Sequence, residues 1–253
     1  MKYTYNYTFE KKDNRDFKFK NLSKPLLNIP LYFNISNLPD VLNQGSLGSC
    51  TAQAVSNALR HCLKKEKPQY PEIIDFQPSR LYIYYYSRFL ANTVNEDSGA
   101  VIRDVMKAIS KYGACSSEYW PYIISKFTIK PPAICLKKGR DHIKGLIYLY
   151  LNQNEKELKS AIFKGYPIIC GIKIFESFES EESLSTGDVQ MPNGQFFGGH
   201  CILLVGYNDL TKRFTFQNSW GIDVGNKGYF TIPYEYILNS DYASDFWTIE
   251  FFK

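Results

Sequence analysis

The spacing of apolar residues changes once along the chain, and this change limits the fold more than any other feature. Up to about residue 166 apolar residues recur at helical spacing, and afterwards they form short runs and alternations typical of strands. We expect helices at residues 50–65, 78–91, 101–112 and 155–166. We expect strands at residues 167–174, 200–208, 212–220, 228–234 and 245–252. Helices first and strands later predict an α+β fold with two lobes, one mainly helical and one mainly β.

The composition is that of an ordinary globular protein. The 253 residues suffice for one large domain or two close-packed lobes. The net charge of +5 is small and the basic residues are dispersed, so neither nucleic acid nor a membrane is expected as a partner. The longest apolar runs are too short to cross a bilayer. The first twenty residues lack the apolar stretch of a secretory signal, so export is not expected.

Cysteine usage points to a reducing environment. No two cysteines form a C-x-x-C pair, so neither a zinc site nor a thioredoxin-type site is expected. An even count would permit three disulfides, but without a signal we interpret most cysteines as reduced, buried, small hydrophobic side chains. We therefore expect the cytoplasm or another reducing compartment, or a virion if the source is viral. The six are Cys50, Cys62, Cys115, Cys135, Cys170 and Cys201.

One cysteine has a different setting. The pliable loop "NQGSLGSC" delivers Cys50 to the start of the first expected helix, where the helix dipole favours a thiolate. A catalytic thiolate also needs a nearby imidazole, and the chain has three histidines. His61 lies on the same helix about 16 Å further along, so it cannot reach the thiol. His142 lies in a charged stretch and is interpreted as a surface residue. His200, which follows two glycines, remains.

A hairpin supplies this histidine with a partner. The segment "VGYNDLTKRF" predicts a turn at about residues 208–212, which pairs residue 200 with 218 or 219, within two positions. The side-chain oxygen of Asn218 could therefore orient the imidazole, and Trp220 could shield that contact from water. Gln44, six residues before the thiol, could donate a hydrogen bond to a developing oxyanion.

Together, "QGSLGSC", "GGHCILLVGYND" and "NSWGIDVGNKGYFTI" resemble the papain family of cysteine proteases, over roughly residues 26–253. The segments "EDSGAVIRD" and "YGACSSEYWPY" resemble its bacterial and viral members. The resemblance implies that Cys50 is the nucleophile, His200 the general acid/base and Asn218 its orienting partner. It also implies that Gln44 and the backbone N–H of Cys50 form the oxyanion hole.

The resemblance further implies a papain-like fold, with a helical lobe, an antiparallel β-barrel-like lobe and the active site in the cleft between them. The helical lobe is expected at about 45–145, and the β lobe at about 146–253 together with 26–44. Residues 1–25 would be an N-terminal extension. The implied reaction is endopeptidase cleavage of a protein or peptide through an acyl-thioester on Cys50, with no metal or organic cofactor.

The chain departs from the family pattern at several positions. Secreted members carry a disulfide between the loop before the nucleophile and the segment before the substrate-binding glycines. Here Leu47 occupies the first position, and "NEDSGA" contains no cysteine. Thr51 and Val224 replace two tryptophans of the family pattern. None of these changes removes a catalytic group, and the loss of both disulfide partners fits a reducing compartment.

The resemblance also places substrate-binding residues. Ser98, Gly99 and Ala100 are expected to line the non-primed side of the cleft and to bind the substrate backbone. Asp245 is expected near the floor of the S2 pocket, where it would favour a basic P2 side chain. The acidic segment at 175–185 is interpreted as a solvated loop.

Two questions stay open from the sequence. The same Cys-His-Asn site could belong to a catalytically silent papain-like binding or inhibitor protein, or to an acyl transferase such as a transpeptidase or transglutaminase. The second question concerns residues 1–25, where aromatic residues at even spacing predict an extended segment with one apolar face. This segment could cover the cleft as a short inhibitory propeptide, or pack outside a lobe or hang free.

Overall fold

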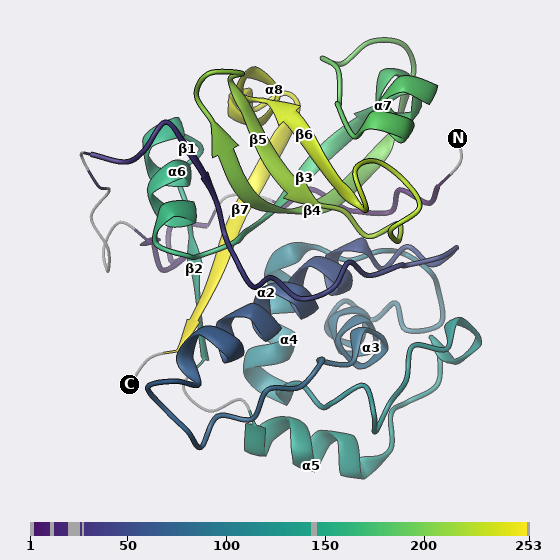
Figure 1. Cartoon of the computed structure of the whole chain (residues 1–253). Helices are drawn as coiled ribbons and strands as arrows, with labels where there is room; N and C mark the ends of the chain where they lie inside the picture. Colours follow the sequence, from purple (N-terminus) through teal and green to yellow (C-terminus); the bar gives the residue numbers. More distant parts are fainter. Residues whose placement is uncertain (1–2, 11–12, 20–25, 27, 143–145, 252–253) are drawn as a thin grey trace.

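The computed structural model describes residues 3–10, 13–19, 26, 28–142 and 146–251. Helices α2 to α5 gather in one half of the molecule and most of the sheet lies in the other, as expected for a two-lobed α+β fold (Figure 1). Among the described residues, no helix is both long and apolar enough to cross a membrane.

The helices of the first half form where the apolar spacing predicts them. The N-cap of α3 is Ser79, whose hydroxyl accepts a hydrogen bond from the Tyr82 N–H. Gly113, whose positive φ of 73° favours glycine, ends α4. The elements are α2 (Cys50–Glu66), α3 (Arg80–Leu90), α4 (Ile102–Tyr112), the 3-10 helix η1 (Ile124–Lys126) and α5 (Ala133–His142). Of these helices, α5 was not expected.

The sheet contains all five expected strands and two further short ones, β1 and β2. The strands are β1 (Tyr32–Asn34), β2 (Leu146–Tyr150), β3 (Ile168–Phe175), β4 (Phe196–Asn208), β5 (Arg213–Gln217), β6 (Tyr229–Pro233) and β7 (Ala243–Phe251). Their order is β2-β7-β3-β4-β5-β6, with β1 paired to β4, and all these pairs are antiparallel. Within the described residues this path has two ends, so the sheet is open and not a closed barrel.

Four shorter helices accompany the sheet. They are α6 (Glu155–Phe163), the 3-10 helix η2 (Glu176–Glu179), α7 (Glu181–Thr186) and α8 (Tyr234–Leu238). The expected solvated loop at 175–185 is therefore largely helical, because Ser180 caps α7 by accepting from the Ser183 N–H.

The core consists of two buried apolar clusters, and the first of them joins the halves. One lies among α2, α3 and α4 and includes Leu203 of β4 and Trp247 of β7, and the other fills the β half. Helix α2 is thus packed against the sheet, with its first residue facing β4. The N-terminal segment, drawn in purple, passes along the boundary between the halves (Figure 1).

Candidate active site

Cys50 is the first residue of α2 and is fully buried. The N-cap residue Ser49 makes no side-chain capping bond to the helix, and its hydroxyl instead bonds the hydroxyl of Tyr122. The Ser49 side chain therefore accepts no hydrogen bond from the first N–H groups of α2. The positive end of the helix dipole lies at the thiol, as the sequence predicts.

His200 on β4 contacts Asn218 in the loop after β5. Nε2 of His200 lies 2.8 Å from Oδ1 of Asn218, which confirms the predicted pairing. Because an amide oxygen only accepts, Nε2 carries the hydrogen, and Nδ1 is left as the basic nitrogen. Nδ1 is buried and has no hydrogen-bond partner among the described residues. The ring of Trp220 lies 5.1 Å from the imidazole, in the expected shielding position.

The side chain of Gln44 is buried and held at both ends. Its Oε1 accepts from the Ser219 hydroxyl at 2.7 Å, and its Nε2 lies 3.1 Å from the carbonyl of Leu47. A backbone bond from Gln44 N–H to the Ser219 carbonyl, 2.8 Å long, joins the two loops. The amide nitrogen is thereby fixed near the start of α2. It also lies 3.4 Å from the carbonyl oxygen of Thr4.

Burial disfavours the charged forms of the thiol and the imidazole. It raises the pKa of Cys50 to about 12, against smaller lowering effects from backbone groups. It lowers the pKa of His200 to about 4, although the contact with Asn218 opposes the shift. In this conformation burial therefore disfavours the charged form of each group.

The N-terminal segment contributes to this burial. Tyr3 stacks on Trp220, with ring centroids 3.9 Å apart and planes 2° apart. Tyr5 meets the imidazole of His200 edge-on, at 5.8 Å and 82°. Between them, the carbonyl of Thr4 faces Gln44. The spacing of two residues thus places the Tyr3 ring on Trp220 and the Tyr5 ring at His200, the predicted general acid/base.

The segment continues past the residues at 98–100. The Tyr7 N–H donates to the Gly199 carbonyl at 3.0 Å, and Asn6 pairs with Gly199 as an isolated parallel bridge. A Cβ on Gly99 would lie 1.6 Å from the Asn6 carbonyl oxygen, so only glycine permits this approach. Ser98 instead bonds the hydroxyl of Thr93 at 2.8 Å. Ala100 is buried.

Tyr7 ends in a buried polar site formed by Asp245. The tyrosine hydroxyl donates to Oδ2 of Asp245, which also accepts from the Glu10 N–H at 3.1 Å and the Ser244 hydroxyl at 2.8 Å. Burial raises the pKa of Asp245, and these hydrogen bonds oppose the shift. The Tyr7 ring lies directly against Gly171, where a Cβ would be 2.0 Å away.

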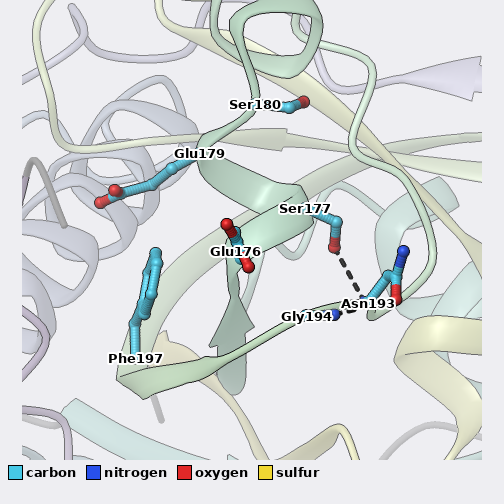
Figure 2. A pocket seen from close by; sticks show the side chains of 7 residues that line it. All are labelled: Glu176, Ser177, Glu179, Ser180, Asn193, Gly194 and Phe197. Carbon is cyan, nitrogen blue, oxygen red and sulfur yellow. Dashed lines mark hydrogen bonds between the residues drawn. The ribbon is translucent and has the colours of Figure 1, made fainter.

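Glu179 is a contact that the sequence did not indicate. Its Oε1 accepts from the Tyr5 hydroxyl at 2.5 Å and from the Tyr3 N–H at 3.2 Å. It lines a hollow of about 470 Å³ between η2 and the start of β4. Figure 2 shows its lining: Glu176, Ser177, Glu179, Ser180, Asn193, Gly194 and Phe197.

The other two histidines are not part of the site formed by His200 and Asn218. His61 is buried and its Nε2 lies 3.2 Å from the Gly165 carbonyl oxygen, a structural contact. His142 ends α5, and its side chain lies outside the described residues. All six cysteines are buried free thiols.

Comparison with known proteins agrees with this geometry. The sequence model described as "Papain family cysteine protease" matches residues 34–240. A peptidase C1-like protein of Acanthamoeba polyphaga mimivirus is 38% identical, over 96% of this chain and 81% of that protein. Cysteine proteinase 1 of Entamoeba histolytica is 27% identical, and the match spans 77% of this chain but only 60% of that protein.

Solved structures extend the likeness to the whole fold. Xylellain, a cysteine protease from Xylella fastidiosa, superposes with a TM-score of 0.89 and 33% identity, over 100% of this chain and 97% of that one. A procathepsin B of Trypanosoma congolense, at 18% identity and a TM-score of 0.66, shares the fold over 90% of this chain and 80% of that one. The chain therefore belongs to the papain family of cysteine proteases.

Proposed function

We propose that this cysteine protease is an endopeptidase whose chemistry is carried by Cys50, His200, Asn218 and Gln44. The observation that supports it most is the contact between His200 Nε2 and Asn218 Oδ1. This contact leaves Nδ1 as the basic nitrogen, on the strand β4 that packs against α2, the helix that begins at the thiol of Cys50. An imidazole held in this tautomer can take a proton from the thiol and return it to a leaving group.

The reaction would proceed in two stages. Nδ1 of His200 takes the Cys50 proton, and the thiolate attacks the carbonyl carbon of the scissile peptide bond. Gln44 Nε2 and the Cys50 N–H donate to the oxyanion that forms. The C–N bond then breaks as the imidazolium protonates the leaving amine, which leaves a thioester on Cys50. Water, deprotonated by His200, cleaves the thioester and restores the thiol.

An epoxide-type thiol inhibitor tests this assignment. We expect covalent modification of Cys50 alone, located by mass spectrometry of the digested protein, and no modification in Cys50→Ala. The other five buried cysteines serve as internal controls. Modification at a different cysteine, or none in folded protein even after removal of residues 1–10, would refute the proposal. Product analysis with an added amine acceptor separates hydrolysis from acyl transfer.

We also propose that residues 3–10 act as a short inhibitory cover, as part of an N-terminal extension spanning residues 1–25. Support comes from contacts with three proposed catalytic or binding residues: Tyr5 with His200, Thr4 with Gln44, and Tyr7 with Asp245. An extended peptide in a substrate-binding cleft competes directly with substrate.

We also propose two lobes, one at about residues 45–145 and one at about 146–253 together with 26–44. The two buried apolar clusters support this division.

The direction of the cover explains why it would resist cleavage. Residue numbers rise from Tyr3 at Trp220 toward Tyr7 at Asp245. If the side of Gly99 and Asp245 receives the acyl half of a substrate, as the family resemblance implies, a substrate runs the opposite way. The carbonyl groups of the cover are then not presented to Cys50 in the orientation of a scissile bond.

The site of Tyr7 suggests which substrates enter after the cover leaves. We propose that this is the S2 pocket, with Gly171 leaving room for a side chain and Asp245 at its floor. Once Tyr7 and Glu10 have left, the Asp245 carboxylate would be a buried acceptor that has lost two donors. A basic P2 side chain can supply a new donor. The substrate would be a protein or peptide.

A reducing compartment remains our proposal for the location. All six cysteines are buried free thiols, which such a compartment would preserve. Thiol titration of the denatured protein, isolated from its native source under alkylating conditions, should count six thiols. A lower count caused by intramolecular disulfides would contradict the proposal.

A further inference from the structure

Asp97 connects the loop before Cys50 to the segment at 98–100. The Gly48 N–H donates to both of its carboxylate oxygens, at 3.1 and 2.9 Å. The hydroxyl of Tyr84, on α3, donates to Oδ1 of the same carboxylate at 2.5 Å. The Gly99 N–H in turn donates to the Tyr84 oxygen at 3.0 Å. One carboxylate thus fixes two loops and a helix relative to one another.

The segment that carries Asp97 is itself held rigidly. The buried guanidinium of Arg88 donates to the carbonyls of Val94 and Glu96, each at 2.8 Å, and to the carbonyl of Phe127. A planar guanidinium with several fixed acceptors fixes the backbone on which they lie. Asp97 therefore projects from a fixed support, whereas its partner Gly48 belongs to a glycine-rich loop with little intrinsic stiffness.

We propose that Asp97 is a positioning residue for the nucleophile: by binding the Gly48 N–H it fixes the loop that delivers Cys50 and the start of α2. The loop has three small residues within positions 45–48, and it leads directly into the N–H of Cys50, a proposed oxyanion donor. A charged acceptor shared by one backbone N–H and one hydroxyl is a strong restraint on such a segment. This inference rests on the proposed role of Cys50.

The electrostatics show that Asp97 is not present to activate the thiol. Burial has the largest effect on the pKa of Cys50, and nearby backbone groups lower this pKa. The negative charge of Asp97 has a smaller effect, which raises the pKa of the thiol. The buried thiol of Cys201 also interacts with Cys50, and the proposed imidazolium of His200 would favour the thiolate. A carboxylate here disfavours ionisation, so its contribution to activity is geometric.

The test uses the full chain and the variant Asp97→Asn, which keeps the side-chain shape and removes the charge. Amide hydrogen exchange of Gly48, followed by NMR, should accelerate at least about tenfold, because a charged acceptor is lost. The value of kcat should fall about 10–10²-fold with KM nearly unchanged, as for a small misplacement of a reacting group. The pH midpoint of Cys50 alkylation should move to lower pH.

Two further variants separate positioning from general destabilisation. Tyr84→Phe removes a donor to Asp97 but keeps its charge, so Gly48 exchange should accelerate without a shift of the alkylation midpoint. Asp104→Asn is the matched control, because this α4 carboxylate lies 3.8 Å from Lys107 near the surface, away from the site. It should change none of the three measurements.

The outcomes distinguish this inference from the proposed function. Unchanged Gly48 exchange in Asp97→Asn would overturn the inference, whether or not the enzyme is active. Accelerated exchange with unchanged kcat per folded molecule would also overturn it. Failure of both the full chain and the chain lacking residues 1–10 to label at Cys50 or to cleave any peptide would refute the proposed function, while the exchange measurement still decides whether Asp97 holds the loop.

Discussion

The carbonyl oxygen of Thr4 lies 3.4 Å from Nε2 of Gln44, the side-chain nitrogen that we assign to the oxyanion hole. A carbonyl at this place is what the donor would meet during peptide hydrolysis. The proposed cover and the proposed oxyanion hole therefore meet at a single amide group.

Removing residues 1–10 should increase the rate of Cys50 alkylation at least about tenfold, because the thiol becomes accessible and its ionisation less costly. The truncation should stop there, because Phe19 is fully buried in the β half and packs on Tyr166 at 5.6 Å. Added peptide of residues 3–10 should slow the reaction again. Equal alkylation rates for the two chains would rule out the cover.

Loss of the cover should also change the pH profile of alkylation. Burial disfavours both charged forms, so it raises the pKa of Cys50 to about 12 and lowers that of His200 to about 4. Solvent access reverses both shifts, and the two values approach or cross. In the shortened chain we therefore expect fast alkylation to persist below pH 7, whereas the full chain should react appreciably only at alkaline pH. Identical profiles would contradict this account.

Glu10 should make the cover dependent on pH. Burial, and then the charge of Asp245, raise its pKa from 4.5 to about 7, against the Trp247 N–H and Arg103. A carboxyl whose pKa is raised in the covered state stabilises that state below its free value of 4.5. This stabilisation is lost as the pH rises through 7. The cover should loosen as the pH rises from about 4.5 to about 7, by at most roughly 10²–10³-fold in its equilibrium.

This effect can be isolated with one variant and one ratio. The alkylation rate of the full chain divided by that of the chain lacking residues 1–10 should rise with pH over this range. Glu10→Gln should make this rise shallower, leaving the part that comes from ionisation of Cys50. Asp13→Asn, which alters an exposed pair with Arg15, should leave the rise intact. A flat ratio in the unmodified chain would exclude Glu10 as the titrating group.

The sequence predicted those parts of the molecule that depend on local pattern. Apolar spacing located α2, α3 and α4, and the hairpin count brought residue 200 near 218, because strand register follows from the turn. Leu203 pairs with Gln217 in that register. Helix α5 was missed because its second half, "KKGRDH", is charged and contains Gly139. Gly113 packs there, where an added Cβ would lie 2.1 Å from the Gly139 carbonyl oxygen.

Contacts between distant segments could not be predicted in this way. Tyr5 and Glu179 are 174 residues apart, and no periodicity in either segment indicates that they meet. The alternating aromatics predicted an extended N-terminal segment, but an apolar face does not specify the surface on which it lies. Asp97 likewise appeared only as part of "EDSGAVIRD", and its hydrogen bonds to Gly48 depend on how two loops pack.

Gln44→Ala should lower kcat about 10²–10³-fold with little change in KM, because an oxyanion donor acts mainly in the transition state. The assay should use the chain lacking residues 1–10, so that a weaker cover does not mask the loss. Gln195→Ala, at an exposed position of the same residue type, is the control and should have no effect. A change confined to KM, or a loss below about threefold, would remove Gln44 from the oxyanion hole.

Asp245 should determine the preference at P2. In the uncovered chain, peptides with Arg or Lys at P2 should be cleaved with higher kcat/KM than those with Leu, because the carboxylate gains a charged partner in a buried pocket. Asp245→Asn should reverse this order by lowering kcat/KM for basic peptides about tenfold or more, while activity on P2 Leu peptides stays within a few-fold.

The contact of Tyr7 predicts a second preference at P2. Because the Tyr7 hydroxyl bonds Oδ2 of Asp245, peptides with Tyr at P2 should be cleaved better than those with Phe. A panel of peptides differing only at P2 gives all these ratios. An unchanged order of P2 preference in Asp245→Asn would show that the carboxylate does not face the substrate.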